Sequence, residues 1–230
     1  MNTTEVLELL EANKNDRGIE NWKKLGPNAG ELKSYGIGLT QLRKLAKQIG
    51  RDRDLATDLW KGDVYDAKVI ALLIDDPKAM TQEQAEAQVE EVGRGQLSHV
   101  FSSCDATLSK TPFVVELALK WMDSEDPGRR GCGYGLLYEV SKSTKKTAPN
   151  DAFFLERIEH IRKTFDREER SVQGSMGGAL IGIGKRNATL NTAALKLARA
   201  IGPIRFGTEF EPLDVAKHLT SDRLREKLGV

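Results

Sequence analysis

Residues 97–108 read LSHVFSSCDATL and show the spacing that recurs along the whole chain. Their apolar side chains lie at offsets of three, four, seven and eleven from the first, as Leu97, Val100, Phe101, Cys104 and Leu108. That spacing is typical of one face of an α-helix. At ~100° per residue, Asp105 then falls ~80° from Leu97, on the shoulder of the buried face. The stretch therefore predicts a helix that holds a carboxylate beside an aromatic ring at the edge of a core.

The same helical spacing recurs from end to end, and no segment alternates in the way of a half-buried strand. Start signals at Thr81, Thr111 and Asn150 lie roughly 30 to 40 residues apart, close to the length of a HEAT-type repeat. A further start is predicted at Asp126-Pro127, and a last helix over residues 213–228. The sequence predicts an all-α fold, a superhelical α-solenoid of HEAT-like helix pairs in one domain over residues 1–230, with a helix bundle as the alternative.

Composition indicates a soluble protein of ordinary size. The chain has 230 residues, of which 39% are hydrophobic and 30% charged. No apolar run approaches the roughly 18 residues of a membrane span, and no signal peptide is recognisable. We expect a cytoplasmic, monomeric protein without membrane partners. With 35 basic and 34 acidic side chains, any binding of nucleic acid must depend on a local patch.

The candidate chemical motifs are weak. Residues 178–185 resemble a phosphate loop, but Ala179 replaces the required glycine and Arg186 the required hydroxyl. The glycines of residues 174–182 instead indicate close approach of a neighbouring helix or of a ligand. The three histidines have no metal-ligand spacing, and both cysteines read as reduced, buried thiols. We therefore expect no metal and no cofactor.

Basic side chains cluster at comparable places in successive helix pairs. The clusters are Arg129-Arg130; Lys142, Lys145 and Lys146; Arg162, Lys163, Arg167 and Arg170; and Lys185-Arg186. In a solenoid such places line one edge or the concave face, so the set predicts a surface for a phosphate backbone.

Several blocks of the sequence carry a family resemblance. They are Gly36-Ile37, Leu42-Arg43-Lys44-Leu45-Ala46-Lys47, Leu55-Ala56, Leu59-Trp60, Tyr65-Asp66-Ala67-Lys68-Val69-Ile70-Ala71, Arg130 with Leu136-Leu137, and the run from Val172-Gln173 to Gly184-Lys185. On these residues the chain, from about Gly36 to Ile201, resembles the DNA alkylation repair (AlkD) family of HEAT-like-repeat DNA glycosylases.

The resemblance implies a protein that holds double-stranded DNA in a concave face and excises positively charged alkylated purines without a cofactor. In that family an aspartate stabilises the cationic sugar, two tryptophans pack against the nucleotide, and an arginine helps to hold the backbone. The aspartate matches Asp105 and the arginine matches Arg130, or Arg129 with a shift of one residue. The tryptophans match Phe101 and Gly178, so the aromatic clamp is at best halved. Trp121, Tyr134 and Tyr138 are the aromatic residues that could replace it.

Three hypotheses follow from the sequence. The first is a DNA glycosylase that uses Asp105 as its charge-stabilising carboxylate. The second is a non-catalytic HEAT-like protein that binds bent or branched DNA and has lost the contact with the lesion. The third is a protein-binding helical scaffold, which basic clusters scattered over the surface rather than aligned in the concave face would favour.

Overall fold

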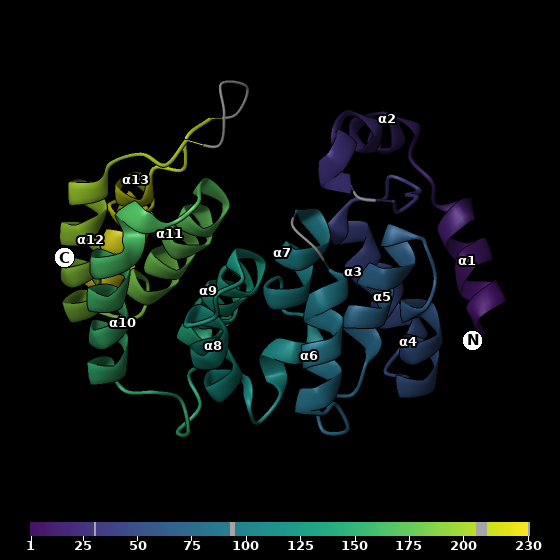
Figure 1. The fold of residues 1–230 in the computed structure, drawn as a ribbon, viewed down its shortest axis with the longest axis horizontal. Helices are drawn as coiled ribbons and strands as arrows, with labels where there is room; N and C mark the ends of the chain where they lie inside the picture. Colours follow the sequence, from purple (N-terminus) through teal and green to yellow (C-terminus); the bar gives the residue numbers. More distant parts are fainter. Residues whose placement is uncertain (30, 93–94, 206–210, 230) are drawn as a thin grey trace. The chain divides into compact units, whose positions relative to one another are not determined.

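The described residues are mainly helical. The structure is a computed structural model and describes residues 1–29, 31–92, 95–205 and 211–229. Within these ranges no strand occurs beyond the isolated bridges Lys33–Val64 and Ile204–Leu213, and no helix is long and apolar enough to cross a membrane. The all-α class is confirmed. The contacts divide the chain into an N-terminal unit, Met1–Phe113, and a C-terminal unit, Val114–Val230 (Figure 1). The single domain over residues 1–230 stays a prediction.

The N-terminal unit is built around one buried helix. Its elements are α1 (Thr3–Ala12), α2 (Asp16–Lys24), the 3-10 turn η1 (Gly26–Ala29), α3 (Leu39–Ile49), α4 (Arg53–Trp60), α5 (Tyr65–Ile74), α6 (Gln82–Glu91), α7 (Gln96–Ser102) and the 3-10 turn η2 (Thr107–Lys110). Eight of the ten residues of α5 are buried, because α1, α3, α4 and α7 all pack against it. A helix that is apolar on most sides is stable only in such a central position.

Two charged residues of α5 explain much of the sequence block around them. Asp66 is fully buried and accepts hydrogen bonds from the Ser34 hydroxyl and from the amides of Tyr35 and Ile37, at 2.7 to 3.0 Å. Lys68 donates to the Trp60 carbonyl and lies 4.3 Å from the centre of the Trp60 ring. Burial lowers the pKa of Lys68. Through Asp66 and Lys68, this part of the sequence therefore fixes α5 to the segment before α3 and to the end of α4.

The C-terminal unit packs its helices around a second core. Its elements are α8 (Val114–Met122), α9 (Pro127–Lys142), α10 (Asp151–Thr164), the 3-10 turn η3 (Phe165–Arg167), α11 (Arg170–Gly184), α12 (Ala188–Ile201), α13 (Val215–Leu219) and α14 (Asp222–Leu228). Helices α9 and α11 pack along each other, α8 packs on α9, and α12 packs on α11. The core is formed by side chains such as Phe154, Met176 and Leu180, which are fully buried.

Close helix packing explains two of the glycines. A Cβ on Gly133 would lie 2.6 Å from the backbone nitrogen of Met122, so α8 and α9 touch at their backbones. A Cβ on Gly182 would lie 2.3 Å from Ser141 Oγ, where α11 meets α9. Packing rather than a ligand therefore accounts for Gly182 in the glycine-rich run. A Cβ on Gly178 meets nothing within 4 Å.

Most predicted helix starts are confirmed, and three details are wrong. The side chains of Thr81, Asp126 and Asn150 accept the amides of Gln84, Arg129 and Phe153 as predicted. The hydroxyl of Thr111 instead donates to the Leu108 carbonyl, and α8 begins at Val114. The last helix is two short helices, α13 and α14.

The opening stretch is the third correction. Helix α7 ends at Ser102, because Cys104 and Asp105 both adopt left-handed backbone conformations with φ of 62° and 60°. Residues 97–108 are therefore a short helix, a tight turn and a 3-10 turn, and Asp105 lies on the turn.

Candidate nucleic-acid interface

The turn that carries Asp105 is held by two basic side chains of the N-terminal unit. Arg43 Nη2 donates to the Cys104 carbonyl oxygen at 2.7 Å, and Lys110 Nζ donates to the Asp105 carbonyl oxygen at 2.5 Å. Arg43 Nη2 also lies 4.0 Å from the Asp105 carboxylate, whose side chain is 62% exposed. The carboxylate of Asp105 therefore faces solvent, while two hydrogen bonds fix the backbone of the turn.

Two consecutive left-handed residues that are not glycine are unfavourable, by about 1–2 kcal/mol each. The hydrogen bonds from Arg43 and Lys110 offset that strain. A third contact joins His99 Nε2 to the Cys104 sulfur at 3.4 Å. Cys104 is only partly buried, so the expectation of two buried thiols is wrong for this cysteine. Arg43 lies in a block that carries the family resemblance, but its spacing gave no sign that it supports Asp105.

The aromatic residues proposed around Asp105 do not form a clamp. Phe101 is 0% exposed, so its ring packs in the core of the N-terminal unit and offers no face to a sugar. Trp121 and Tyr134 are buried in the C-terminal unit, at 0% and 1% exposure. Gly178 is partly exposed on α11 and has no side chain to present. Of the aromatic residues considered, Tyr138 alone is partly exposed.

Arg130 is occupied by contacts within the C-terminal unit. Its Nε and Nη2 donate to the Glu168 carboxylate at 2.8 to 3.0 Å, and its Nη1 donates to the carbonyls of Ser124 and Glu125. The side chains of Arg130 and Glu168 are only 20% and 9% exposed. The hydrogen bond with Glu168 raises the pKa of Arg130. Arg130 thus joins the start of α9 to the segment before α11, with its neighbour Arg129 half-buried beside it.

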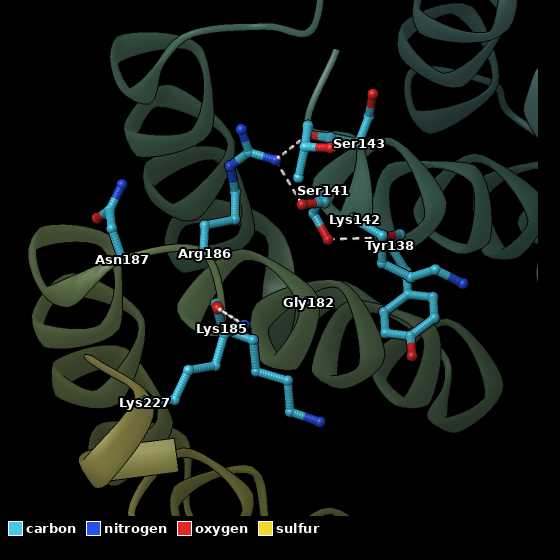
Figure 2. A pocket seen from close by; sticks show the side chains of 10 residues that line it. Tyr138, Ser141, Lys142, Ser143, Gly182, Lys185, Arg186, Asn187 and Lys227 are labelled. Carbon is cyan, nitrogen blue, oxygen red and sulfur yellow. Dashed lines mark hydrogen bonds between the residues drawn. The ribbon is translucent and has the colours of Figure 1, made fainter. Parts of the chain in front are cut away.

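A pocket at the other end of α9 brings together three of the predicted basic residues. It has a volume of about 390 Å³ and is lined by Tyr138, Ser141, Lys142, Ser143, Thr144, Gly182, Lys185, Arg186, Asn187 and Lys227 (Figure 2). Lys142 ends α9, Lys185 and Arg186 follow α11, and Lys227 comes from α14. No carboxylate is among the lining residues. The sequence did not indicate Lys227, because only the packing of α14 brings it here.

The four cations of the pocket differ in how firmly they are held. Arg186 Nη1 donates to the carbonyls of Ser141 and Ser143, and its guanidinium lies 4.4 Å from the centre of the Phe154 ring. Lys142 pairs with Glu139 at 2.6 Å. Among the residues that the structure describes, Lys227 makes a single long contact, from its Nζ to the Lys185 carbonyl oxygen at 3.4 Å. Within the described part of the chain, no carboxylate pairs with the exposed ammonium of Lys185.

The remaining basic residues lie outside the pocket. Lys145 and Lys146 are exposed on the loop after α9. Arg162 and Lys163 pair with Glu159 on the surface of α10. The structure therefore gathers Lys142, Lys185 and Arg186, and leaves Arg129 and Arg130 at the far end of the 16-residue α9. No group of three or more metal-ligating side chains lies among the described residues.

Comparisons with known proteins agree with this architecture. A sequence model described as DNA alkylation repair enzyme matches residues 6–203. A solved structure is described as "A new family of proteins related to the HEAT-like repeat DNA glycosylases with affinity for branched DNA structures". It aligns with a TM-score of 0.84 and 22% identity, over 100% of this chain and 97% of that chain, which confirms the HEAT-like helical fold. A search of curated proteins gave no match.

Proposed function

The chain belongs to the DNA alkylation repair enzyme family, and from that membership we propose that it is a DNA-binding protein whose C-terminal unit holds the phosphates. One observation carries the proposal: Lys142, Lys185, Arg186 and Lys227 line a single pocket without a carboxylate. Lys, Arg, Ser and Thr side chains are the usual partners of phosphate oxygens. Their gathering in one place argues against a protein-binding scaffold with scattered charges.

The positions of the aromatic residues support DNA binding without base excision. Excision of an alkylated purine needs contacts that hold the modified nucleotide, and Phe101 is buried while position 178 is glycine. The solved relative in fold is described as having affinity for branched DNA structures. Branched DNA is therefore the substrate class to test beside ordinary duplex.

Binding to DNA is expected to weaken steeply with salt, because each neutralised phosphate releases counterions. Replacing both Lys185 and Lys227 with glutamine should weaken binding about tenfold and lower the slope of log K against log salt by about two. The measurement is fluorescence anisotropy with a duplex and a four-way junction of equal length. The matched control is Lys196→Gln with Lys217→Gln, two exposed lysines of the same unit outside the pocket. Equal losses in both double variants would contradict the proposal.

Excision of alkylated purines is the second candidate function, and Asp105 is the observation that favours it. Its carboxylate is exposed on a turn fixed by Arg43 and Lys110. A carboxylate held in this way can stabilise the positive charge that develops on the sugar as the N-glycosidic bond breaks.

Asp105→Asn separates the two functions. Asparagine tolerates the left-handed conformation, so the variant should keep the turn and bind DNA within about twofold of the original affinity. Release of free 7-methylguanine or 3-methyladenine from duplex DNA is then measured at enzyme excess. If the protein excises, Asp105→Asn should slow release about 100- to 1,000-fold. Absence of release by the unaltered protein would leave binding as its function.

A further inference from the structure

The pocket of the C-terminal unit is larger than a contact with one backbone phosphate requires. Its volume of about 390 Å³ falls in the range of about 300–1,000 Å³ that is typical of small-molecule sites. Contacts with the phosphates of a continuous duplex are made from open surface and need no such hollow. The size of the pocket suits a ligand as large as a nucleotide.

The cations stand on different sides of this hollow. In Figure 2, Arg186 reaches toward Ser141 and Ser143 on one side, Lys185 and Lys227 lie on another, and Lys142 lies beside Tyr138. A ligand that meets them all must carry negative charge at more than one point. A nucleotide with a phosphate on each side has that charge distribution.

Much of the pocket is fixed before any ligand binds. The carbonyls of Ser141 and Ser143 and the Phe154 ring hold the Arg186 guanidinium in place. The nearby carboxylates are already engaged, Glu139 by Lys142 and Asp151 by the Asn187 amide at 2.9 to 3.1 Å. The four cations of the pocket outnumber these two carboxylates, so positive charge exceeds negative charge around the hollow. A cation that is already held in place loses less entropy when a ligand binds.

We propose that this pocket binds the phosphate monoester of a terminal nucleotide, as found at the phosphorylated end of a DNA strand. The proposal rests on the DNA-binding function above and names the part of the DNA that this site takes. A monoester carries about −1.5 to −2 charges at pH 7, whereas each phosphate within a strand carries a single one. A terminal nucleotide presents the monoester together with the next phosphate of the strand, which matches cations on separate sides.

The test compares DNA ends that differ by one phosphate. Duplexes with a single-stranded overhang are prepared with a phosphate or a hydroxyl at the 5′ end, and a second pair with the same difference at the 3′ end. At about pH 7.5 the phosphate should tighten binding about tenfold, measured by anisotropy at one salt concentration. The preference should shrink toward about pH 5.5, because the second pKa of the monoester is about 6.

One lysine and a free nucleotide complete the design. Lys185→Gln should abolish the preference for phosphorylated ends, while Lys196→Gln, an exposed lysine outside the pocket, should keep it. Thymidine 3′,5′-bisphosphate is added as a competitor. If it binds the protein but not Lys185→Gln, and DNA ends make no difference, the monoester chemistry is supported and its source is a free nucleotide.

Equal affinity for phosphate and hydroxyl ends, without binding of the bisphosphate, would overturn the inference. A closed DNA dumbbell without ends shows which proposal has failed. If the dumbbell binds with the expected salt dependence, general DNA binding stands and the pocket serves only internal phosphates. If neither the dumbbell nor any open DNA binds, the proposed function itself has failed.

Discussion

Replacing Arg130 with alanine is expected to lower the free energy of unfolding by about 3–5 kcal/mol. The substitution leaves the Glu168 carboxylate, whose side chain is 9% exposed, without its bidentate partner. It also removes the donor to the Ser124 and Glu125 carbonyls. Urea unfolding of the variant and the unaltered protein measures the loss directly. DNA affinity, measured where both are folded, should change less than about twofold.

The matched control is Arg162→Ala. Arg162 also pairs with a glutamate in the same unit, but its side chain is 58% exposed and that of Glu159 is 46% exposed. An exposed pair of this kind contributes little to stability, so the Arg162→Ala variant should unfold at nearly the same urea concentration as the unaltered protein. The opposite pattern, a stable Arg130→Ala variant that binds DNA tenfold more weakly, would assign Arg130 to the DNA backbone as the family resemblance implies.

Asp66→Ala is expected to lower the free energy of unfolding by about 2–4 kcal/mol. The carboxylate is fully buried and accepts three hydrogen bonds. Its removal leaves the Ser34 hydroxyl and the amides of Tyr35 and Ile37 without their acceptor. Each buried donor that is left without an acceptor lowers stability by about 1–3 kcal/mol, and by less where water can reach it. Hydrogen exchange should show the amides of Tyr35 and Ile37 losing protection, because the segment before α3 is no longer tied to α5.

Asp63→Ala is the control for Asp66. Asp63 forms a single ion pair with Lys33 at 2.7 Å, and its side chain is 62% exposed. The loss of this exposed pair should leave the urea midpoint nearly unchanged. The Asp66→Asn variant keeps one acceptor oxygen, so its loss in the free energy of unfolding should lie between those of Asp63→Ala and Asp66→Ala. An Asp66→Ala variant that unfolds at the same urea concentration as the unaltered protein would show that the buried hydrogen bonds contribute nothing net.

The helices were predictable because their signals are local. Asp126-Pro127 and Asn150 specify helix starts through contacts within three residues, and Gly50 ends α3 with a positive φ of 82°. The end of α7 was not predictable in this way. The apolar spacing of residues 97–108 continues a helix, but Arg43, some 61 positions away, donates to the Cys104 carbonyl and supports a left-handed turn. The spacing of apolar residues does not reveal a contact between residues so far apart in the sequence.

The residues of the candidate site show the same difference between local signals and contacts that are distant in sequence. Sequence clustering named Lys142, Lys185 and Arg186, and the pocket contains all three. The clustering also named Arg130, which forms a buried ion pair, and the family resemblance named Phe101, which packs in the core. Residue type and spacing do not distinguish an arginine facing a phosphate from one facing Glu168. The distinguishing fact is a neighbour 38 positions away.

By itself, then, the sequence determined an all-α chain of HEAT-like helix pairs, the positions of most helix starts, and the family to which it is related. These depend on spacing, caps and blocks of residues that lie close together in the chain. The tertiary structure alone decided which charged groups are occupied and which face solvent. It placed Asp105 on an exposed turn, paired Arg130 with Glu168, and added Lys227 to the basic pocket. The reason is physical, since an ion pair or a pocket is made by side chains that only packing brings together.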